Sequence, residues 1–164
     1  EGCVGCHSQL VRPFRSETER YGEYSKSGEY IYDRPFLWGS KRTGPDLMRE
    51  GTGNKNAKPD SWHYNHMIDP RTMSPGSIMP QYPQLADNEL DLSLLPAKIT
   101  ALRKLGTPYP HGYESRAVAD AQQQAKKIAA RLKEEGIKDE NMESKEMVAL
   151  IAYLQRLGTD INVK

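Results

Sequence analysis

Two cysteines and a histidine lie together at the start of the chain, in the order Cys3-Val4-Gly5-Cys6-His7. The spacing Cys-x-x-Cys-His is typical of a c-type haem attachment site. The two thiols can add to the two vinyl groups of one porphyrin, and the adjacent imidazole can ligate the iron. We therefore expect Cys3 and Cys6 to hold one covalent haem c, with His7 as an axial ligand of its iron.

Other uses of a Cys-x-x-Cys pair fit this chain less well. A thioredoxin-like redox motif belongs near alternating strands and helices, and the sequence shows no such alternation. A structural zinc site needs four ligands, and the chain has only 2 cysteines. A disulfide across so short a loop would be strained and would leave His7 without a role. Haem attachment is the favoured interpretation.

A c-type haem iron that transfers electrons needs a sixth ligand, and the segment 73–80 offers one. Its prolines and glycine predict an ordered loop, and Met79 is followed directly by proline. A thioether ligand raises the reduction potential, because soft sulfur favours ferrous iron. We expect Met79 to be this ligand, with Met73 in reserve. The alternative is that Met79 only packs and that His63 or His66 ligates.

Two further stretches offer contacts to the haem. In Gly44-Pro45-Asp46-Leu47, Pro45 is expected to pack against the haem, and a backbone carbonyl can accept the ring N–H of His7. In and after a short helix predicted over 61–68 and capped by Ser61 or Asp60, Trp62 and Arg71 can donate to the haem propionates. His63 and His66 lie one helical turn apart, but no carboxylate or cysteine lies at a matching helical spacing, so a second metal site is not favoured.

The elements that position these residues are predicted to be helices and long loops. Apolar residues recur at helical spacing over 93–105, 115–135 and 144–157, and each segment is followed by a glycine. Residues 8–43 show no sustained periodicity and are expected to be irregular, with their aromatics either packing the loop or forming a docking surface. We expect a mainly α, cytochrome c-like fold as one haem domain, 1–164, with insertions at about 8–43 and 84–142.

Composition narrows the possible partners. Only 37% of the residues are hydrophobic, which is lean for 164 residues and consistent with a prosthetic group that supplies apolar bulk. A net charge of +1 gives no support to nucleic-acid binding. No run approaches the length of a membrane span. In most small c-type cytochromes a helix runs into the attachment motif, so we expect Glu1 to mark a point at which a longer chain was cut.

The chain shows the pattern common to small c-type cytochromes: Cys-x-x-Cys-His, Gly-Pro-x-Leu, Met-Pro and a final amphipathic helix. In addition, several long strings resemble the mono-haem subunit of cbb₃-type cytochrome c oxidase. These strings are Cys-His-Ser-Gln (6–9), Arg-Pro-Phe-Arg (12–15), Arg-Tyr-Gly-Glu-Tyr-Ser (20–25), Tyr-Asp-Arg-Pro-Phe-Leu-Trp-Gly-Ser-Lys-Arg-Thr-Gly-Pro-Asp-Leu (32–47), Trp62-His63 through His66, Asp-Pro-Arg (69–71), Gly-Ser-Ile-Met-Pro-Gln-Tyr-Pro (76–83) and Leu-Gly-Thr-Pro-Tyr (105–109). The loop 51–60 departs from that family's pattern.

The resemblance implies a haem domain on the periplasmic face of the bacterial inner membrane, anchored by an N-terminal helix that lies outside this sequence. It implies electron transfer from another c-type cytochrome, a sister subunit or a diffusible one, to the haem–copper catalytic subunit. With both axial positions filled, the chain would not reduce oxygen on its own. The alternatives are a diffusible cytochrome, the cytochrome subunit of a related nitric oxide reductase, and a haem-based sensor or peroxidase in which Met79 is displaceable.

Overall fold

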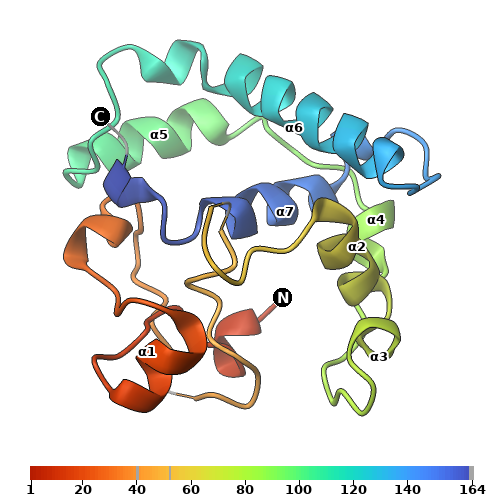
Figure 1. Cartoon of the computed structure of the whole chain (residues 1–164). Helices are drawn as coiled ribbons and strands as arrows, with labels where there is room; N and C mark the ends of the chain where they lie inside the picture. Colours follow the sequence, from red (N-terminus) through yellow and green to blue (C-terminus); the bar gives the residue numbers. More distant parts are fainter. Residues whose placement is uncertain (40, 52, 163–164) are drawn as a thin grey trace. The chain divides into compact units, whose positions relative to one another are not determined.

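The computed structural model describes residues 1–39, 41–51 and 53–162, and within these ranges the protein is helical (Figure 1). The α-helices of the described residues are α1 (Arg15–Tyr21), α2 (Asp60–Ile68), α3 (Pro70–Met73), α4 (Gln84–Asp87), α5 (Leu95–Lys104), α6 (Ala117–Glu134) and α7 (Glu146–Arg156). Short 3-10 helices join them: η1 (Cys3–Gly5), η2 (Ser27–Tyr30), η3 (Tyr113–Ser115), η4 (Met142–Ser144) and η5 (Asp160–Asn162). The described ranges contain no named strand. The predicted mainly α class is confirmed.

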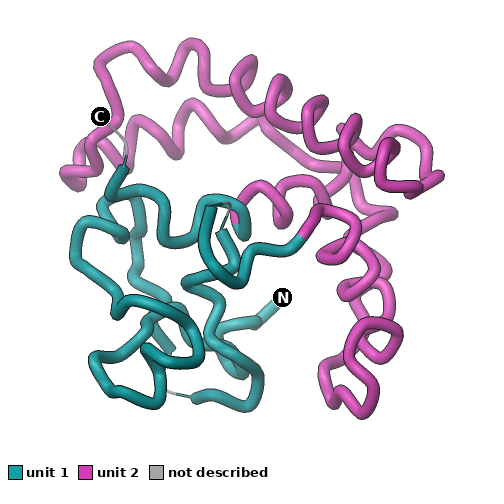
Figure 2. Tube along the Cα trace, in the orientation of Figure 1, with its two compact units in different colours: residues 1–58, 154–164 teal, residues 59–153 magenta. Residues whose placement is uncertain are grey.

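The chain divides into two compact units (Figure 2). Unit 1 comprises Glu1–Lys58 and Leu154–Lys164, and unit 2 comprises Pro59–Tyr153. The last helix, α7, contributes residues to both. The expectation of one haem domain over 1–164 stays a prediction.

Unit 2 is built around the long amphipathic helix α6. This helix contacts α2, α5, η3 and η4. Its small and branched residues alternate with charged ones at helical spacing, which gives it one apolar face. The buried core of unit 2 consists of Tyr64, Leu85, Ala125, Ile128, Leu132, Met142, Met147, Val148 and Ile151. The additional helices predicted before the C-terminal helix are therefore α4, α5 and α6. Of these, α4 and α6 pack with α2 and α7 around ordinary apolar side chains, and α5 contacts α6.

Unit 1 has little helix and is held together largely by hydrogen bonds and ion pairs. Its buried apolar side chains are Val11, Tyr21, Tyr30, Met48, Leu154 and Leu157. Among them lies a buried ion pair, in which Arg49 Nη1 is 2.7 Å from Glu29 Oε2. Glu17 and Asp46 are buried as well. Long loops can be ordered here because buried charges bond to backbone groups that no helix or sheet satisfies.

Three sequence expectations need correction. Residues 8–43 are not wholly irregular, since they contain α1 and η2. The sequence pattern does not predict α1, because this helix is short, charged and lacks an apolar stripe. Neither Ser61 nor Asp60 caps helix α2: the helix begins at Asp60, its cap position is Pro59, which has no side-chain acceptor, and the Asp60 carboxylate accepts from Arg131 Nε at 2.8 Å. Met73 ends the short helix α3 rather than lying in a loop, because Asp69 caps α3 and Pro70 fits its first turn.

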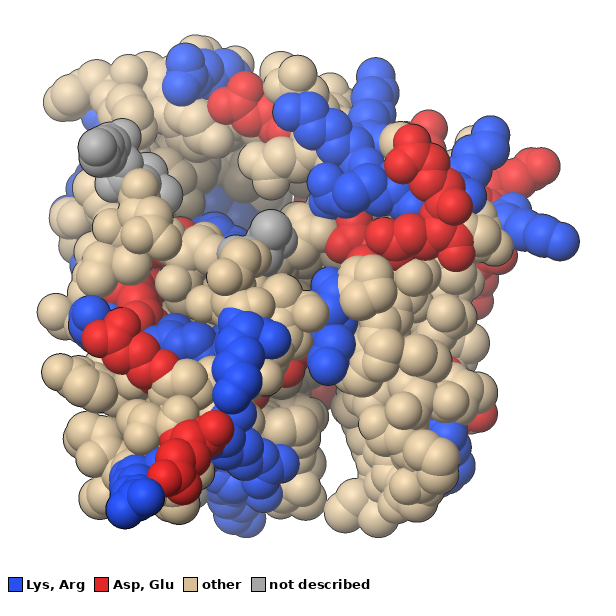
Figure 3. Space-filling model, viewed as in Figure 1, with Lys and Arg blue, Asp and Glu red and all other residues tan. Residues whose placement is uncertain are grey.

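Charged side chains are mixed rather than segregated on the face of the protein shown in Figure 3, including the region around the C-terminal end of α6. This agrees with the net charge of +1. Within the described ranges, none of the helices has the length and apolar character needed to cross a bilayer.

Candidate haem site

The attachment motif forms a single helical turn at the start of unit 1. The Cys3 carbonyl accepts the backbone N–H groups of both Cys6, at 3.1 Å, and His7, at 2.8 Å. Both cysteines are free thiols; Cys3 is half-buried and Cys6 is exposed. The turn therefore places two cysteines that form no disulfide next to one histidine, as attachment to a porphyrin requires.

His7 is oriented by the Gly-Pro-x-Leu segment. Its Nδ1 lies 2.7 Å from the backbone carbonyl oxygen of Pro45. Because a carbonyl oxygen can only accept a hydrogen bond, Nδ1 carries the proton and Nε2 keeps its lone pair. This is the tautomer that a metal ligand needs, and the hydrogen bond fixes the orientation of the ring. The expected contact between this segment and His7 is present.

Gly44 packs directly against the His7 ring. A Cβ atom built on Gly44 would lie 2.3 Å from His7 Cε1 and 2.7 Å from each ring nitrogen. The Gly44 N–H also donates to the Cys6 carbonyl at 2.9 Å. A side chain at position 44 would therefore displace the imidazole, and glycine is required by the close approach of the two segments.

Asp46 ties the motif segment to the segment that holds His7. Its buried carboxylate accepts from the Ser8 hydroxyl at 2.6 Å, from the Leu10 N–H at 2.8 Å and from the Met48 N–H at 2.9 Å. In addition, the Leu47 N–H donates to the Ser8 carbonyl at 2.9 Å. These bonds hold the residues on either side of Pro45 in register with those that follow His7.

A cluster of charged side chains, Arg42, Glu17 and Arg12, lies next to the hydrogen bonds of Asp46. Arg42 Nη2 lies 2.8 Å from Glu17 Oε2, 2.8 Å from the Leu10 carbonyl oxygen and 3.4 Å from Asp46 Oδ2. Arg12 also pairs with Glu17. Burial opposes ionisation of Glu17, but the hydrogen bonds from Arg42 and Arg12 outweigh it and lower its pKa to about 2. Glu17 is therefore a permanent anion near neutral pH.

The histidines and the tryptophan predicted as candidates in α2 lie against one another. The Trp62 ring stacks on the His66 ring, with centroids 4.6 Å apart, and meets the His63 ring edge-on at 5.5 Å. His63 is buried, whereas Trp62 and His66 are half-buried. The stack fixes the plane of the Trp62 indole, which remains a predicted donor to a haem propionate.

The remaining candidates also belong to unit 2. Met79 is half-buried in a loop, and its backbone N–H donates to the Ser77 hydroxyl at 3.2 Å. Arg71 is exposed beside Asp69, and Met73 is half-buried. His7 belongs to unit 1 and Met79 to unit 2. Their pairing as the two axial ligands stays a prediction.

The donor set of unit 1 fits a covalently attached haem. Two free thiols, an imidazole with a lone pair on Nε2 and a glycine without a side chain are brought together by two short segments, 3–7 and 44–46. Sequence spacing identified the thiols, His7 and Pro45. It missed the roles of Asp46, Glu17 and Arg42, because their partners are distant in sequence; the only local signal was a carboxylate directly after Pro45.

Comparison with known families agrees with this arrangement. Residues 1–161 match the model of the family described as cytochrome c oxidase, mono-heme subunit/FixO. A search of curated protein sequences finds no match. The family comprises mono-haem electron-transfer subunits of a respiratory, membrane-bound oxidase of the cbb₃ type. By this match over nearly its whole length, and with a haem-attachment turn in place at its start, the chain belongs to the FixO family of mono-haem cytochrome c oxidase subunits.

Proposed function

We propose that this chain binds one haem c covalently and passes electrons towards the haem–copper catalytic subunit of a cbb₃-type cytochrome c oxidase. The observation that carries the proposal is the attachment turn, in which two free thiols adjoin an imidazole whose Nδ1 donates to Pro45. The family match supports an oxidase subunit with one haem. When bound, the haem supplies a one-electron couple between ferric and ferrous iron.

The residues of unit 1 attach and orient the haem in this proposal. Cys3 and Cys6 form thioethers, and His7 offers Nε2 to the iron. The hydrogen bond to the Pro45 carbonyl keeps the proton on Nδ1 and prevents rotation of the ring. Pro45 also packs against the haem. Gly44 leaves room for the imidazole, and Asp46 keeps the two segments together.

The other ligand and contacts in this proposal are those that the sequence predicts. Met79 supplies the second axial ligand, with Met73 in reserve, while Trp62 and Arg71 donate to the propionates. With both His7 and Met79 ligating the iron, the chain would not reduce oxygen itself; that reaction would belong to the haem–copper subunit. The electron donor is another c-type cytochrome, and the domain lies on the periplasmic face of the bacterial inner membrane.

The test is a comparison of the visible and near-infrared spectra of the haem-loaded protein with those of Met79→Ala. We expect a low-spin iron with the weak red charge-transfer band of methionine sulfur in both the wild type and the matched control Met73→Ala. The band should disappear only in Met79→Ala. If Met73→Ala loses the band instead, the reserve ligand is correct; a bis-histidine or high-spin wild type would contradict methionine ligation.

Covalent attachment is tested separately by mass. The protein should retain one haem after extraction with acidified organic solvent. Cys3→Ser and Cys6→Ser should each retain it through a single thioether, and the double variant should release it. A wild-type protein that releases its haem on extraction would contradict the proposed c-type attachment, whatever the axial ligands are.

A further inference from the structure

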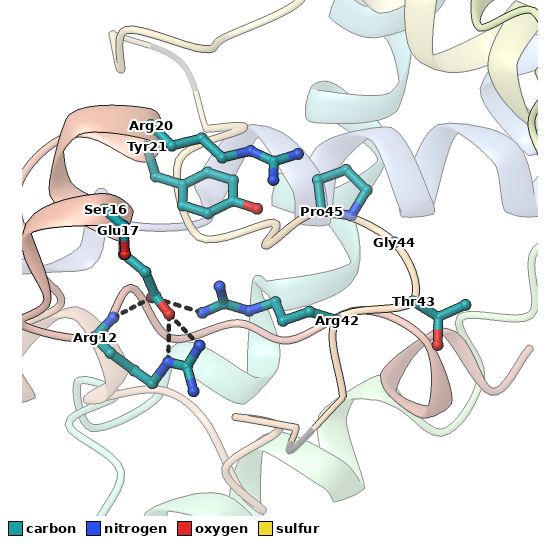
Figure 4. Close-up of a pocket in the computed structure, with 9 residues that line it drawn as sticks. All are labelled: Arg12, Ser16, Glu17, Arg20, Tyr21, Arg42, Thr43, Gly44 and Pro45. Atoms are coloured by element: carbon teal, nitrogen blue, oxygen red, sulfur yellow. Dashed lines mark hydrogen bonds and ion pairs between the residues drawn. The ribbon is translucent and has the colours of Figure 1, made fainter.

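An arginine-lined pocket in unit 1 adjoins the residues that orient His7. It is open, has a volume of about 450 Å³, and lies between α1, the loop before it and the segment 42–45. Figure 4 shows that the Arg12 and Arg42 side chains converge on Glu17, whereas the Arg20 side chain extends towards Pro45. Arg12 and Arg42 therefore face a carboxylate in this pocket, and Arg20 does not.

The charges that line this pocket do not cancel. Glu17, an anion near neutral pH, is shared by Arg12 and Arg42. The Arg20 guanidinium lies over the Tyr21 ring, 5.1 Å from its centroid, and no described residue places a carboxylate within ion-pair distance of it. Three guanidinium groups therefore face a pocket with one carboxylate among its lining residues. Asp46, whose Oδ2 is 3.4 Å from Arg42 Nη2, is a second carboxylate next to this group, so two carboxylates oppose three guanidinium groups and one additional anion would complete the charge balance.

The pocket opens beside the residue that orients the proposed iron ligand. Gly44 and Pro45 form part of its wall, and Pro45 is exposed. The Pro45 carbonyl is 2.7 Å from His7 Nδ1. Pro45 therefore belongs both to the wall of the pocket and to the hydrogen bond that orients the imidazole.

We propose that this pocket is a docking site for an acidic side chain of the electron-donor cytochrome, gripped by Arg20 and steered by Arg12 and Arg42. A carboxylate matches the planar donor fork of a guanidinium, and two of the arginines already show this pairing within the chain. The polar, open character of the pocket suits a transient, charge-steered encounter rather than a permanent, apolar subunit interface. This inference rests on the proposed function: the ferrous donor loses one electron, and the ferric haem of this chain gains it.

The test uses the haem-loaded protein, Arg20→Gln and the matched control Arg15→Gln. Arg15 belongs to the same helix, is exposed, pairs with Glu19 and does not line the pocket. Both substitutions remove one positive charge, so they change the net charge of the protein equally. Each protein is reduced by ferrous–EDTA, an anionic carboxylate complex, and by hexaammineruthenium(II), a cationic reductant.

We expect Arg20→Gln to slow reduction by ferrous–EDTA about threefold at low salt, because it removes a charge at the site of encounter. Arg15→Gln should slow the reaction by less than about 1.5-fold, and the difference should vanish at about 0.5 M salt, where the Debye length is only a few ångströms. Neither variant should be reduced more slowly by the cationic complex. A capped tri-glutamate peptide should shift the NMR signal of the Arg20 side-chain N–H but not that of Arg15.

Several outcomes would overturn the inference while leaving the proposed function intact. These are equal slowing by both variants, no slowing by Arg20→Gln, and peptide binding that bypasses Arg20 or is matched by inorganic phosphate at equal charge. A changed haem spectrum or reduction potential in Arg20→Gln would show that Arg20 serves the haem itself. A wild-type protein that lacks covalent haem would instead refute the proposed function, and the inference with it.

Discussion

At the scale of single residues, the His7 ring is oriented by one hydrogen bond and by its close packing against Gly44, which has no side chain. The Pro45 carbonyl fixes the proton on Nδ1, and the bare Cα of Gly44 leaves space for the ring. Both constraints come from adjacent residues of one short segment. The position of the imidazole therefore depends on how that segment is held, and Asp46 holds it through the Ser8 hydroxyl.

Gly44→Ala should move the imidazole. Its Cβ would lie 2.3 Å from His7 Cε1, which is far inside a van der Waals contact, and the backbone on both sides is fixed by hydrogen bonds. We expect a loss of about 1–3 kcal/mol in the free energy of unfolding, typical of overpacking, together with a shifted reduction potential. Urea unfolding and redox titration of the haem-loaded protein measure both.

The control for this substitution is Gly5→Ala. Gly5 lies in the attachment turn, and a Cβ atom there would meet no described atom within 4 Å. Its free energy of unfolding should change by no more than about 0.5 kcal/mol. Equal stability of Gly44→Ala and the wild type would mean that the His7 ring does not depend on the bare Cα.

At the scale of elements, α1 is attached to unit 1 by its buried carboxylate. Glu17 accepts from the Arg12 N–H at 2.8 Å and from Arg42 Nη2 at 2.8 Å. The helix has few apolar residues, so its other stabilising contacts are the buried Tyr21 and the exposed pair of Arg15 with Glu19. Its attachment should therefore depend on the ionisation of one side chain.

The stability of the protein should fall in acid because of Glu17. Its pKa is lowered from 4.5 to about 2, so the ionised form is favoured by folding. The contribution is fully present above about pH 5 and is lost as the pH falls towards 2. After allowance for solvent screening, we expect a loss of about 1–2 kcal/mol over this interval that Glu17→Gln does not show.

Urea unfolding at a series of pH values measures this difference. Glu19→Gln is the control, because Glu19 is on the same helix but is exposed and pairs with Arg15 at the surface. It should retain the acid-dependent loss of the wild type. A wild type and a Glu17→Gln variant with parallel stability profiles between pH 5 and 2 would contradict the assigned role of Glu17.

Apart from α2, which is predicted from its capping residues, the helices that the sequence predicts are those with a repeating apolar pattern. Helices α5, α6 and α7 fall within the predicted segments because their buried residues recur at helical spacing. The helix α1 has no such pattern, and its stability comes from Arg42, which is remote in sequence. The same distinction holds at the site: Cys3, Cys6 and His7 are identified by local spacing, whereas the role of Asp46 depends on tertiary contacts that no local pattern encodes.

At the scale of the whole molecule, one helix belongs to both compact units. The residues of α7 up to Tyr153 belong to unit 2, where Met147 and Ile151 are buried, and Leu154 is buried within unit 1. A helix forms cooperatively along its length, so loss of the turns in one unit weakens those in the other. The two units should therefore unfold in one transition.

The two tryptophans allow this to be tested, since Trp38 lies in unit 1 and Trp62 in unit 2. Trp62→Phe leaves a reporter of unit 1, and Trp38→Phe leaves a reporter of unit 2. We expect the urea midpoints followed by fluorescence to coincide with the midpoint followed by circular dichroism in each variant, as a two-state transition requires. Adding Ala152→Pro, which interrupts α7 close to the division, should make the reporter and circular dichroism midpoints diverge. Divergent midpoints without that substitution would show that the continuity of α7 does not couple the units.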